Sequence, residues 1–107
     1  VVHLETDTSN FDKQRNKVAG VTDLERGNFA RLLNSGFHNA FRELYPKKTK
    51  YTYFSYRTFG RRHNSGMMID YFLLTDGLMR RAEDVKVLET IYGSDHLPVE
   101  LSINLKK

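Results

Sequence analysis

The sequence predicts a mixed fold of the α/β or α+β class, with a helix in the first third of the chain and strands after it. Two observations support this prediction. Apolar residues recur at helical spacing after residue 22, and after residue 50 their period changes to that of strands. Of the 107 residues, 39% are hydrophobic and 28% are charged, which is the composition of a globular domain. We therefore expect one compact unit.

The helical part is expected to begin with a capping box. The polar stretch over residues 5–20 has no periodicity and predicts a loop before it. The Thr22 hydroxyl can accept a hydrogen bond from the Glu25 amide, while the Glu25 side chain reaches back, so the helix should start there. Gly36 is the expected stop. One face of the helix is apolar and carries Phe29, Leu32 and Leu33.

Strands are expected in the second half of the chain. A short helical or irregular segment over residues 37–45 comes first and is closed by Pro46. The predicted strands cover residues 51–56, 67–74, 85–90 and 97–105. The last one alternates apolar with polar residues, as a half-buried strand does. The run over 67–74 is apolar on both faces, which predicts a central strand.

Two polar positions interrupt this apolar pattern. Asp70 stands inside the predicted central strand, where an ionised carboxylate is costly unless it has a partner. The residues Gly-Ser-Asp-His at 93–96 directly precede the last strand. If the two strands are neighbours, Asp70 can accept the imidazole N–H of His96 and stabilise the imidazolium, as in hydrolases. The alternatives are a surface histidine and a structural carboxylate.

Positive charge is concentrated in one segment. The net charge is +4, and residues 42–63 contain seven basic residues and one acidic residue, a local charge of +6. The basic residues are Arg42, Lys47, Lys48, Lys50, Arg57, Arg61 and Arg62. Tyrosines and phenylalanines are interleaved with them, which is typical of surfaces that bind nucleic-acid phosphates and bases. A solvated basic loop is the alternative.

Composition excludes several classes of protein. The absence of cysteine excludes a disulfide scaffold, a thiolate zinc site and a cysteine nucleophile. No apolar run is long enough for a membrane span, and the N-terminus lacks the layout of a secretory signal. We therefore expect no membrane partner and an intracellular location, which would be the nucleus in a eukaryote and the cytoplasm otherwise.

Five short motifs follow one another along the chain. They are Leu44-Tyr45-Pro46, Tyr51-Thr52-Tyr53-Phe54, Asn64-Ser65-Gly66, Asp70-Tyr71-Phe72-Leu73-Leu74 and Gly93-Ser94-Asp95-His96-Leu97-Pro98-Val99. Together they resemble the C-terminal half of the exonuclease III family of abasic-site (apurinic or apyrimidinic) DNA endonucleases, over nearly the whole chain. The Ser-Asp-His motif alone would suit the wider DNase I-like superfamily. The aromatic block preceded by Leu-Tyr-Pro favours the abasic-site branch.

This resemblance implies a fold, an activity and partners. The fold would be half of a four-layer α/β sandwich of the DNase I-like endonuclease/exonuclease/phosphatase superfamily. Residues 1–107 would form the C-terminal half of a single domain, with the N-terminal half outside the chain. The activity would be Mg²⁺-dependent hydrolysis of the phosphodiester 5′ of an abasic site in base excision repair, with Mn²⁺ as an alternative ion. The partners would be double-stranded abasic DNA and the N-terminal half. The family's metal-binding Glu and Asp-x-Asn pair lie in that half, so the chain alone is expected to be inactive.

The resemblance also assigns roles to residues. The implied catalytic residues are His96, Asp70 and Asp95, with Asp95 also assigned to the metal. The implied substrate-binding residues are Tyr53, Arg57, Asn64, Met67 and Ile69. Tyr53, Met67 and Ile69 would line the pocket for an extruded abasic sugar, and Arg57 would enter the duplex. The family usually has tryptophan at the position of Met67, which is a more adaptable side chain. The alternatives are another DNase I-like phosphoesterase, such as a retrotransposon endonuclease, and a non-catalytic nucleic-acid-binding module.

Overall fold

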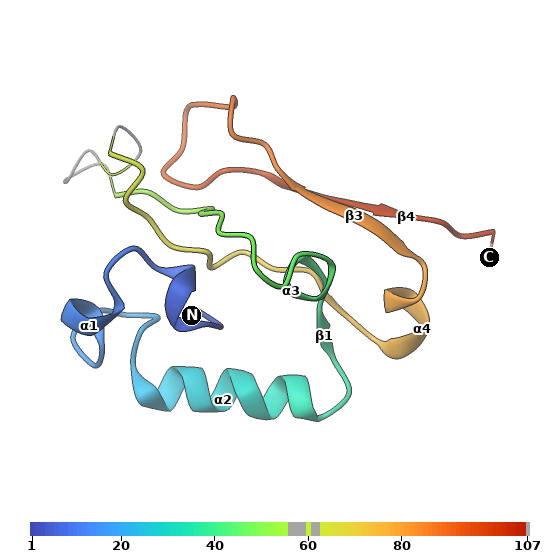
Figure 1. The fold of residues 1–107 in the computed structure, drawn as a ribbon, viewed down its shortest axis with the longest axis horizontal. Helices are drawn as coiled ribbons and strands as arrows, with labels where there is room; N and C mark the ends of the chain where they lie inside the picture. Colours follow the sequence, from blue (N-terminus) through green and yellow to red (C-terminus); the bar gives the residue numbers. More distant parts are fainter. Residues whose placement is uncertain (56–59, 61–62, 107) are drawn as a thin grey trace.

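The computed structural model describes residues 1–55, 60 and 63–106 and has a mixed α/β architecture (Figure 1). In chain order its elements are η1 (Glu5–Asp7), α1 (Phe11–Gln14), α2 (Asp23–Asn34), β1 (His38–Asn39), α3 (Ala40–Leu44), β2 (Leu73–Leu74), α4 (Asp76–Met79), β3 (Ala82–Val87) and β4 (Val99–Ile103). In Figure 1, α2 lies on one side, the β3–β4 ribbon lies on the other, and α3 with the extended segments runs between them. The expected order of a helix followed by strands is therefore confirmed.

Helix α2 begins as the sequence predicts. Thr22 Oγ1 accepts the Glu25 amide at 3.1 Å, and the Glu25 carboxylate accepts the Thr22 hydroxyl and the Gly20 amide, both at 2.8 Å. These hydrogen bonds, that of Thr22 first, hold the pKa of Glu25 below its usual range. The predicted apolar face is only partly covered, because Phe29 is buried whereas Leu32 is exposed.

The loop predicted over residues 5–20 is wrong in part, because η1 and α1 lie within it. The Asp7 carboxylate accepts the Leu4 amide at 3.0 Å and closes the turn of η1. In α1, Phe11 is buried in a cluster with Val2, Val21 and Met67. With three and four residues, these helices are about one turn long, so neither leaves a periodic pattern in the sequence.

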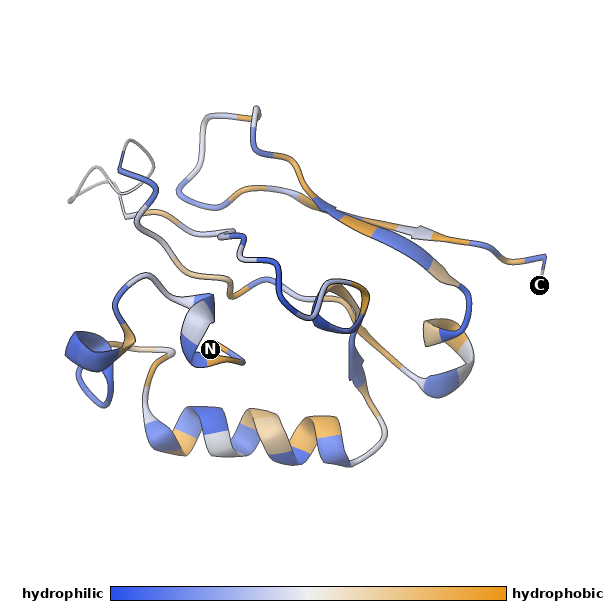
Figure 2. Ribbon diagram, viewed as in Figure 1, coloured by the Kyte–Doolittle hydropathy of each residue, from blue (hydrophilic) through white to orange (hydrophobic). Residues whose placement is uncertain are grey.

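The regular strands of the described residues form two antiparallel pairs. Strand β1 pairs with β2, with His38 opposite Leu74, and β3 pairs with β4, with Val85 opposite Leu101. The strand predicted at 85–90 begins three residues earlier, and the one predicted at 97–105 is shorter. Figure 2 shows apolar and polar residues alternating along both. A core cluster lies beneath this ribbon and contains Ala40, Phe41, Met68, Leu74 and Val85.

The central strand predicted at 67–74 is also wrong, since only Leu73–Leu74 is a regular strand there. Within the described residues, the Met68 amide donates to the Asp7 carbonyl at 2.6 Å. The next two amides donate to the side chain of Thr52. Because successive amides have different partners, no ladder can form. The strand predicted at 51–56 is likewise reduced to isolated bridges at Tyr53, and Tyr56 lies outside the described residues.

None of the helices in residues 1–55, 60 and 63–106 has the length and hydrophobicity required to cross a membrane. The longest of them, α2, is amphipathic, and polar residues recur along its length (Figure 2).

A histidine joins three of these elements. The Nδ1 atom of His38, in β1, lies 2.9 Å from the carboxylate of Glu43 in α3. Its Nε2 atom contacts the carboxylate of Asp76, the first residue of α4. The hydrogen bond with Asp76, followed by that with Glu43, holds the pKa of His38 above its usual value of 6.5. The charged imidazolium therefore favours the packing of α3 and α4 around β1.

We expect this arrangement to make stability depend on pH. Because the pKa of His38 is higher in the folded than in the unfolded chain, its contribution is complete below about pH 6.5 and is lost as pH rises through the folded value. His38→Gln should flatten that part of the profile, and so should Asp76→Asn. The free energy of unfolding, measured by urea denaturation at a series of pH values from below to above 6.5, tests this prediction. An unchanged profile in both variants would contradict it.

Candidate active site

Three extended segments meet at residues 52–54. Tyr53 and Met67 exchange backbone hydrogen bonds of 3.0 Å in both directions. On the other side, the Phe54 amide donates to the Asp95 carbonyl at 2.8 Å, and the Leu97 amide donates to the Thr52 carbonyl at 2.7 Å. Segment 52–54 is therefore the middle one of three. This arrangement brings residues 67–70 and 95–97 to its two sides.

Asp70 and His96 contact each other across this junction. The Nδ1 atom of His96 lies 2.9 Å from Oδ2 of Asp70, and the two side chains are 44% and 35% exposed. An ionised carboxylate only accepts hydrogen bonds, so Nδ1 carries the proton and Nε2 is the nitrogen left for a ligand. The Tyr53 ring packs beside the imidazole, with 5.2 Å between ring centroids. The expectation that Asp70 lies in a buried strand is wrong, because its carboxylate is partly open to solvent.

A tight turn orients the residues that precede His96. Gly93 has a φ of +115°, a conformation that favours glycine, and the Ser94 hydroxyl accepts the His96 amide at 3.1 Å. The carbonyl of Asp95 is fixed by Phe54, as described above, and its side chain is partly buried. A local hydrogen bond from the His96 amide to Ser94 and a long-range one from Phe54 to Asp95 therefore hold this short, glycine-dependent loop.

The donor set for a divalent cation is incomplete within the part of the chain that the structure describes. Its His, Asp and Glu side chains form no group of three or more that could hold a metal ion. Asp95 offers one carboxylate. Mg²⁺ is usually held by one or two carboxylates together with water and phosphate oxygens, so Asp95 could be one ligand of a shared site. The described residues alone do not fit a complete site, and no chemical step can be assigned to a metal from them.

The residues predicted to bind substrate are only partly brought together. Tyr53 and Met67 line a cavity of about 360 Å³, and Ser9 and Ser65 also line it. Ile69 packs with Tyr53 against the Phe11 cluster and is not among the residues that line the cavity. Asn64 is exposed on a turn, with a φ of +52°. Arg57 lies outside the described residues, as do Arg61 and Arg62.

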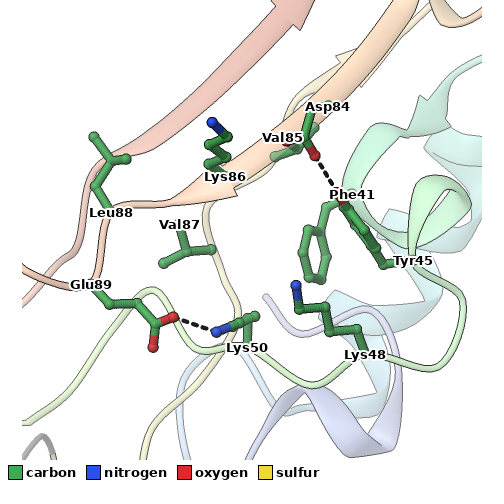
Figure 3. Close-up of a pocket in the computed structure, with 10 residues that line it drawn as sticks. All are labelled: Phe41, Tyr45, Lys48, Lys50, Asp84, Val85, Lys86, Val87, Leu88 and Glu89. Atoms are coloured by element: carbon green, nitrogen blue, oxygen red, sulfur yellow. Dashed lines mark hydrogen bonds and ion pairs between the residues drawn. The ribbon is translucent and has the colours of Figure 1, made fainter.

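Some residues of the basic segment make contacts inside the chain. Arg42 is buried and pairs with Asp7, so its assignment to a nucleic-acid surface is wrong. The Lys50 ammonium pairs with Glu89, and the Lys48 ammonium lies 4.7 Å from the centroid of the Tyr45 ring. Figure 3 shows both lysines at a cavity of about 290 Å³ between α3 and β3. Lys47 is exposed.

Sequence reasoning missed two residues that shape the site. Thr52 is completely buried, and its hydroxyl accepts two amides of the Asp70 segment. Gly66 lies against the middle segment, where a Cβ atom would be 2.3 Å from the Tyr53 carbonyl oxygen and 2.7 Å from the Phe54 ring. Both residues stand inside motifs that carry the resemblance, but nothing in those motifs indicates the role of either residue.

The chain resembles known proteins along nearly its whole length. It is 42% identical to an exodeoxyribonuclease of Bacillus subtilis over 106 residues, which are 98% of this chain and 42% of that protein. It is 42% identical to the DNA repair nuclease APEX1 of Danio rerio over 102 residues, 94% of this chain and 33% of that protein. A solved 3′-5′ exonuclease (NExo) from Neisseria meningitidis matches 97% of this chain and 42% of its own, with a TM-score of 0.90 and 29% identity. No protein-family model matches the chain.

The chain therefore has the DNase I-like fold of the nucleases that it matches, which confirms the predicted fold class. Within that class, the chain is a homologue of exonuclease III-like and AP endonuclease proteins, as its motifs predicted. It spans less than half the length of the relatives it matches.

We expect Gly66→Ala to disturb the packing of Gly66 against Tyr53 and Phe54. The added methyl group must displace backbone and a packed ring, which should lower the free energy of unfolding by about 1–3 kcal/mol. Gly77→Ala is the matched control, because a Cβ there meets nothing within 4 Å. It should be neutral or stabilising by up to about 1 kcal/mol. Urea unfolding measures both, and equal effects would contradict the close contact at Gly66.

Proposed function

We propose that this chain supplies the histidine–carboxylate part of a DNA repair nuclease that hydrolyses the phosphodiester 5′ of an abasic site. The observation that carries the proposal is the 2.9 Å contact between Asp70 and His96, on a scaffold similar to named DNA nucleases over most of its length. Residues 1–107 would act as the C-terminal half of one domain. The partners are abasic double-stranded DNA and the N-terminal half. Such a protein works in the nucleus of a eukaryote and in the cytoplasm otherwise.

His96 has the chemistry that phosphodiester hydrolysis requires. Negative charge grows on the phosphate oxygens in the transition state, and a positioned imidazolium can stabilise it or donate a proton from Nε2. The Asp70 carboxylate accepts a hydrogen bond from Nδ1–H, which fixes the tautomer and would stabilise the charged ring. The partial exposure of His96 leaves room for a phosphate to reach it. Asp95 would be one ligand of Mg²⁺ or Mn²⁺, which neutralises phosphate charge when bound, and the other ligands would come from outside the chain.

The aromatic, apolar and basic side chains near the site suggest how an abasic substrate would be recognised. Tyr53 and Met67, which line the cavity, would contact a sugar that has no base and has turned out of the duplex, and Ile69 would support them from the adjacent apolar cluster. Arg57 would enter the duplex and stack in the gap left by the missing base. Lys47, which is exposed, would contact phosphates without distinguishing damaged from intact DNA.

A non-catalytic nucleic-acid-binding module is the second candidate. The observation in its favour is the incomplete metal-ligand set among the described residues. A nuclease acting on other DNA, such as a retrotransposon endonuclease, is a third reading of the same site. A test of incision on intact and abasic duplexes distinguishes all three.

The proposal is tested with a chimera in which this chain replaces the matching segment of the Bacillus subtilis exodeoxyribonuclease. The substrate is a duplex carrying a tetrahydrofuran abasic analogue. We expect the chimera to cut 5′ of the analogue in Mg²⁺, and the chain alone to be inactive because ligands are missing. EDTA should abolish cutting. Binding without cutting would favour the non-catalytic module, and equal cutting of intact DNA would favour another nuclease.

The Asp70–His96 pair should behave as one unit in this chimera. His96→Ala should lower kcat by about 1,000-fold or more and Asp70→Ala by about 10- to 100-fold, with little change in KM, since the pair acts on the transition state. The double variant should be no worse than His96→Ala. Glu83→Ala, which removes an exposed carboxylate on β3, is the control and should retain activity. Additive losses in the double variant would mean that the two residues act separately.

A further inference from the structure

We propose that Thr52 is a positioning residue, whose hydroxyl holds the Asp70 segment at the distance from His96 that the catalytic pair requires. This inference rests on the proposed function, because it assigns a role within the same site. It concerns a side chain that does not touch the reacting groups itself.

The Thr52 hydroxyl binds two consecutive backbone amides. Its Oγ1 atom accepts the Ile69 amide at 3.1 Å and the Asp70 amide at 3.2 Å. A hydroxyl oxygen has two lone pairs, so one atom can satisfy both donors. Thr52 has no exposed surface, and water is therefore not at hand to replace it. The Asp70 amide and the carboxylate that contacts the imidazole belong to the same residue. The hydrogen bond to Thr52 therefore fixes the backbone that carries this carboxylate.

The backbone of the same residue fixes the other partner. The Thr52 carbonyl accepts the Leu97 amide at 2.7 Å, directly after His96. The Thr52 amide donates to the Met67 carbonyl at 2.8 Å. Thr52 thus forms hydrogen bonds with both the segment that carries Asp70 and the segment that carries His96. Backbone contacts locate the His96 segment, whereas the hydroxyl locates the Asp70 segment.

Removal of the hydroxyl should therefore affect one side of the pair selectively. The isosteric Thr52→Val variant keeps the volume and the backbone hydrogen bonds but leaves two amides without an acceptor. The segment at 69–70 must then move toward another acceptor, and the Asp70 carboxylate moves with it. Thr52→Ser keeps the hydroxyl and should keep the geometry.

The kinetic test uses the chimera described above. Thr52→Val should lower kcat by about 10- to 100-fold, because a displacement of about 1 Å at a reacting group can cost about 100-fold. KM should change by less than about 3-fold, since the transition state alone is affected. Thr52→Ser should restore kcat. Thr8→Val is the matched control, because Thr8 is a buried threonine bridged to Met67 whose hydroxyl bonds to Gln14 and not to residues 69–70.

Coupling to Asp70 separates positioning from general stability. In an Asp70→Ala background, Thr52→Val should cause no further loss of kcat, because the group it positions is already absent. If Thr52→Val does not fold, Thr52→Cys takes its place, since a thiol of similar size is a weaker acceptor. In that case kcat should be retained in Thr52→Ser and should fall in Thr52→Cys.

A spectroscopic test on the full chain does not depend on activity. Thr52→Val should raise the hydrogen-exchange rates of the Ile69 and Asp70 amides by about 10-fold or more relative to Thr8→Val. It should also weaken the Nδ1–H proton signal of His96. An inactive unmodified chimera would overturn the proposed function, while these spectra would still decide the role of Thr52. Unchanged amide exchange, an equal loss of kcat in Thr8→Val, or an undiminished effect in Asp70→Ala would each overturn the positioning role.

Discussion

The buried ion pair between Asp7 and Arg42 is the constraint on which the rest of the structure depends. Asp7 is almost fully buried, and its carboxylate contacts the Arg42 guanidinium. The same guanidinium donates to the carbonyls of Tyr45 at 2.9 Å and Lys48 at 2.8 Å. It therefore joins η1, α3 and the turn after α3 at one point. Loss of either partner would leave a buried charge, which costs about 3–5 kcal/mol in other proteins.

This constraint extends from the ion pair to the candidate active site. The Asp7 carbonyl accepts the Met68 amide, so the residue that holds Arg42 also holds the start of the Asp70 segment. Thr52 takes the next two amides and connects them to the loop of His96. A second anchor lies on the α2 side, where the Tyr71 hydroxyl accepts the His3 amide and its single proton faces the carbonyls of Met68 and Val1. Burial raises the pKa of Tyr71. The position of Asp70 thus follows from buried contacts at both ends.

The parts of the fold that the sequence predicts well are those set by neighbours in the chain. The cap at Thr22 and the end of α2 depend on residues three or four positions apart, and the structure has both. The conformation of residues 67–74 depends on Asp7 and Thr52, which are distant in sequence. The apolar run therefore predicted a continuous strand that the structure does not have. Charge counting placed Arg42 on a surface because a count along the chain cannot distinguish a buried guanidinium from an exposed one.

The contact between Asp70 and His96 was predictable for a different reason. Each residue conflicts with its local pattern, and a polar residue in an apolar run needs a partner wherever that partner lies. Thr52 gave no such signal, because a threonine in an extended aromatic segment fits the pattern of a strand. Its role appears only when the acceptors of the Ile69 and Asp70 amides are traced in space.

A comparison of two ion pairs, Asp7–Arg42 and Asp70–His96, shows that burial decides which of them a ligand can reach. Asp7 and Arg42 are enclosed, their hydrogen bonds go to backbone and to each other, and no ligand can reach them. Asp70 and His96 have similar elements, a carboxylate and a nitrogen base, but about a third or more of each side chain is open. A partly exposed imidazole is accessible to a ligand such as a phosphate, whereas an enclosed guanidinium is not. The enclosed pair therefore holds the segments together, whereas the partly exposed pair is open to a ligand.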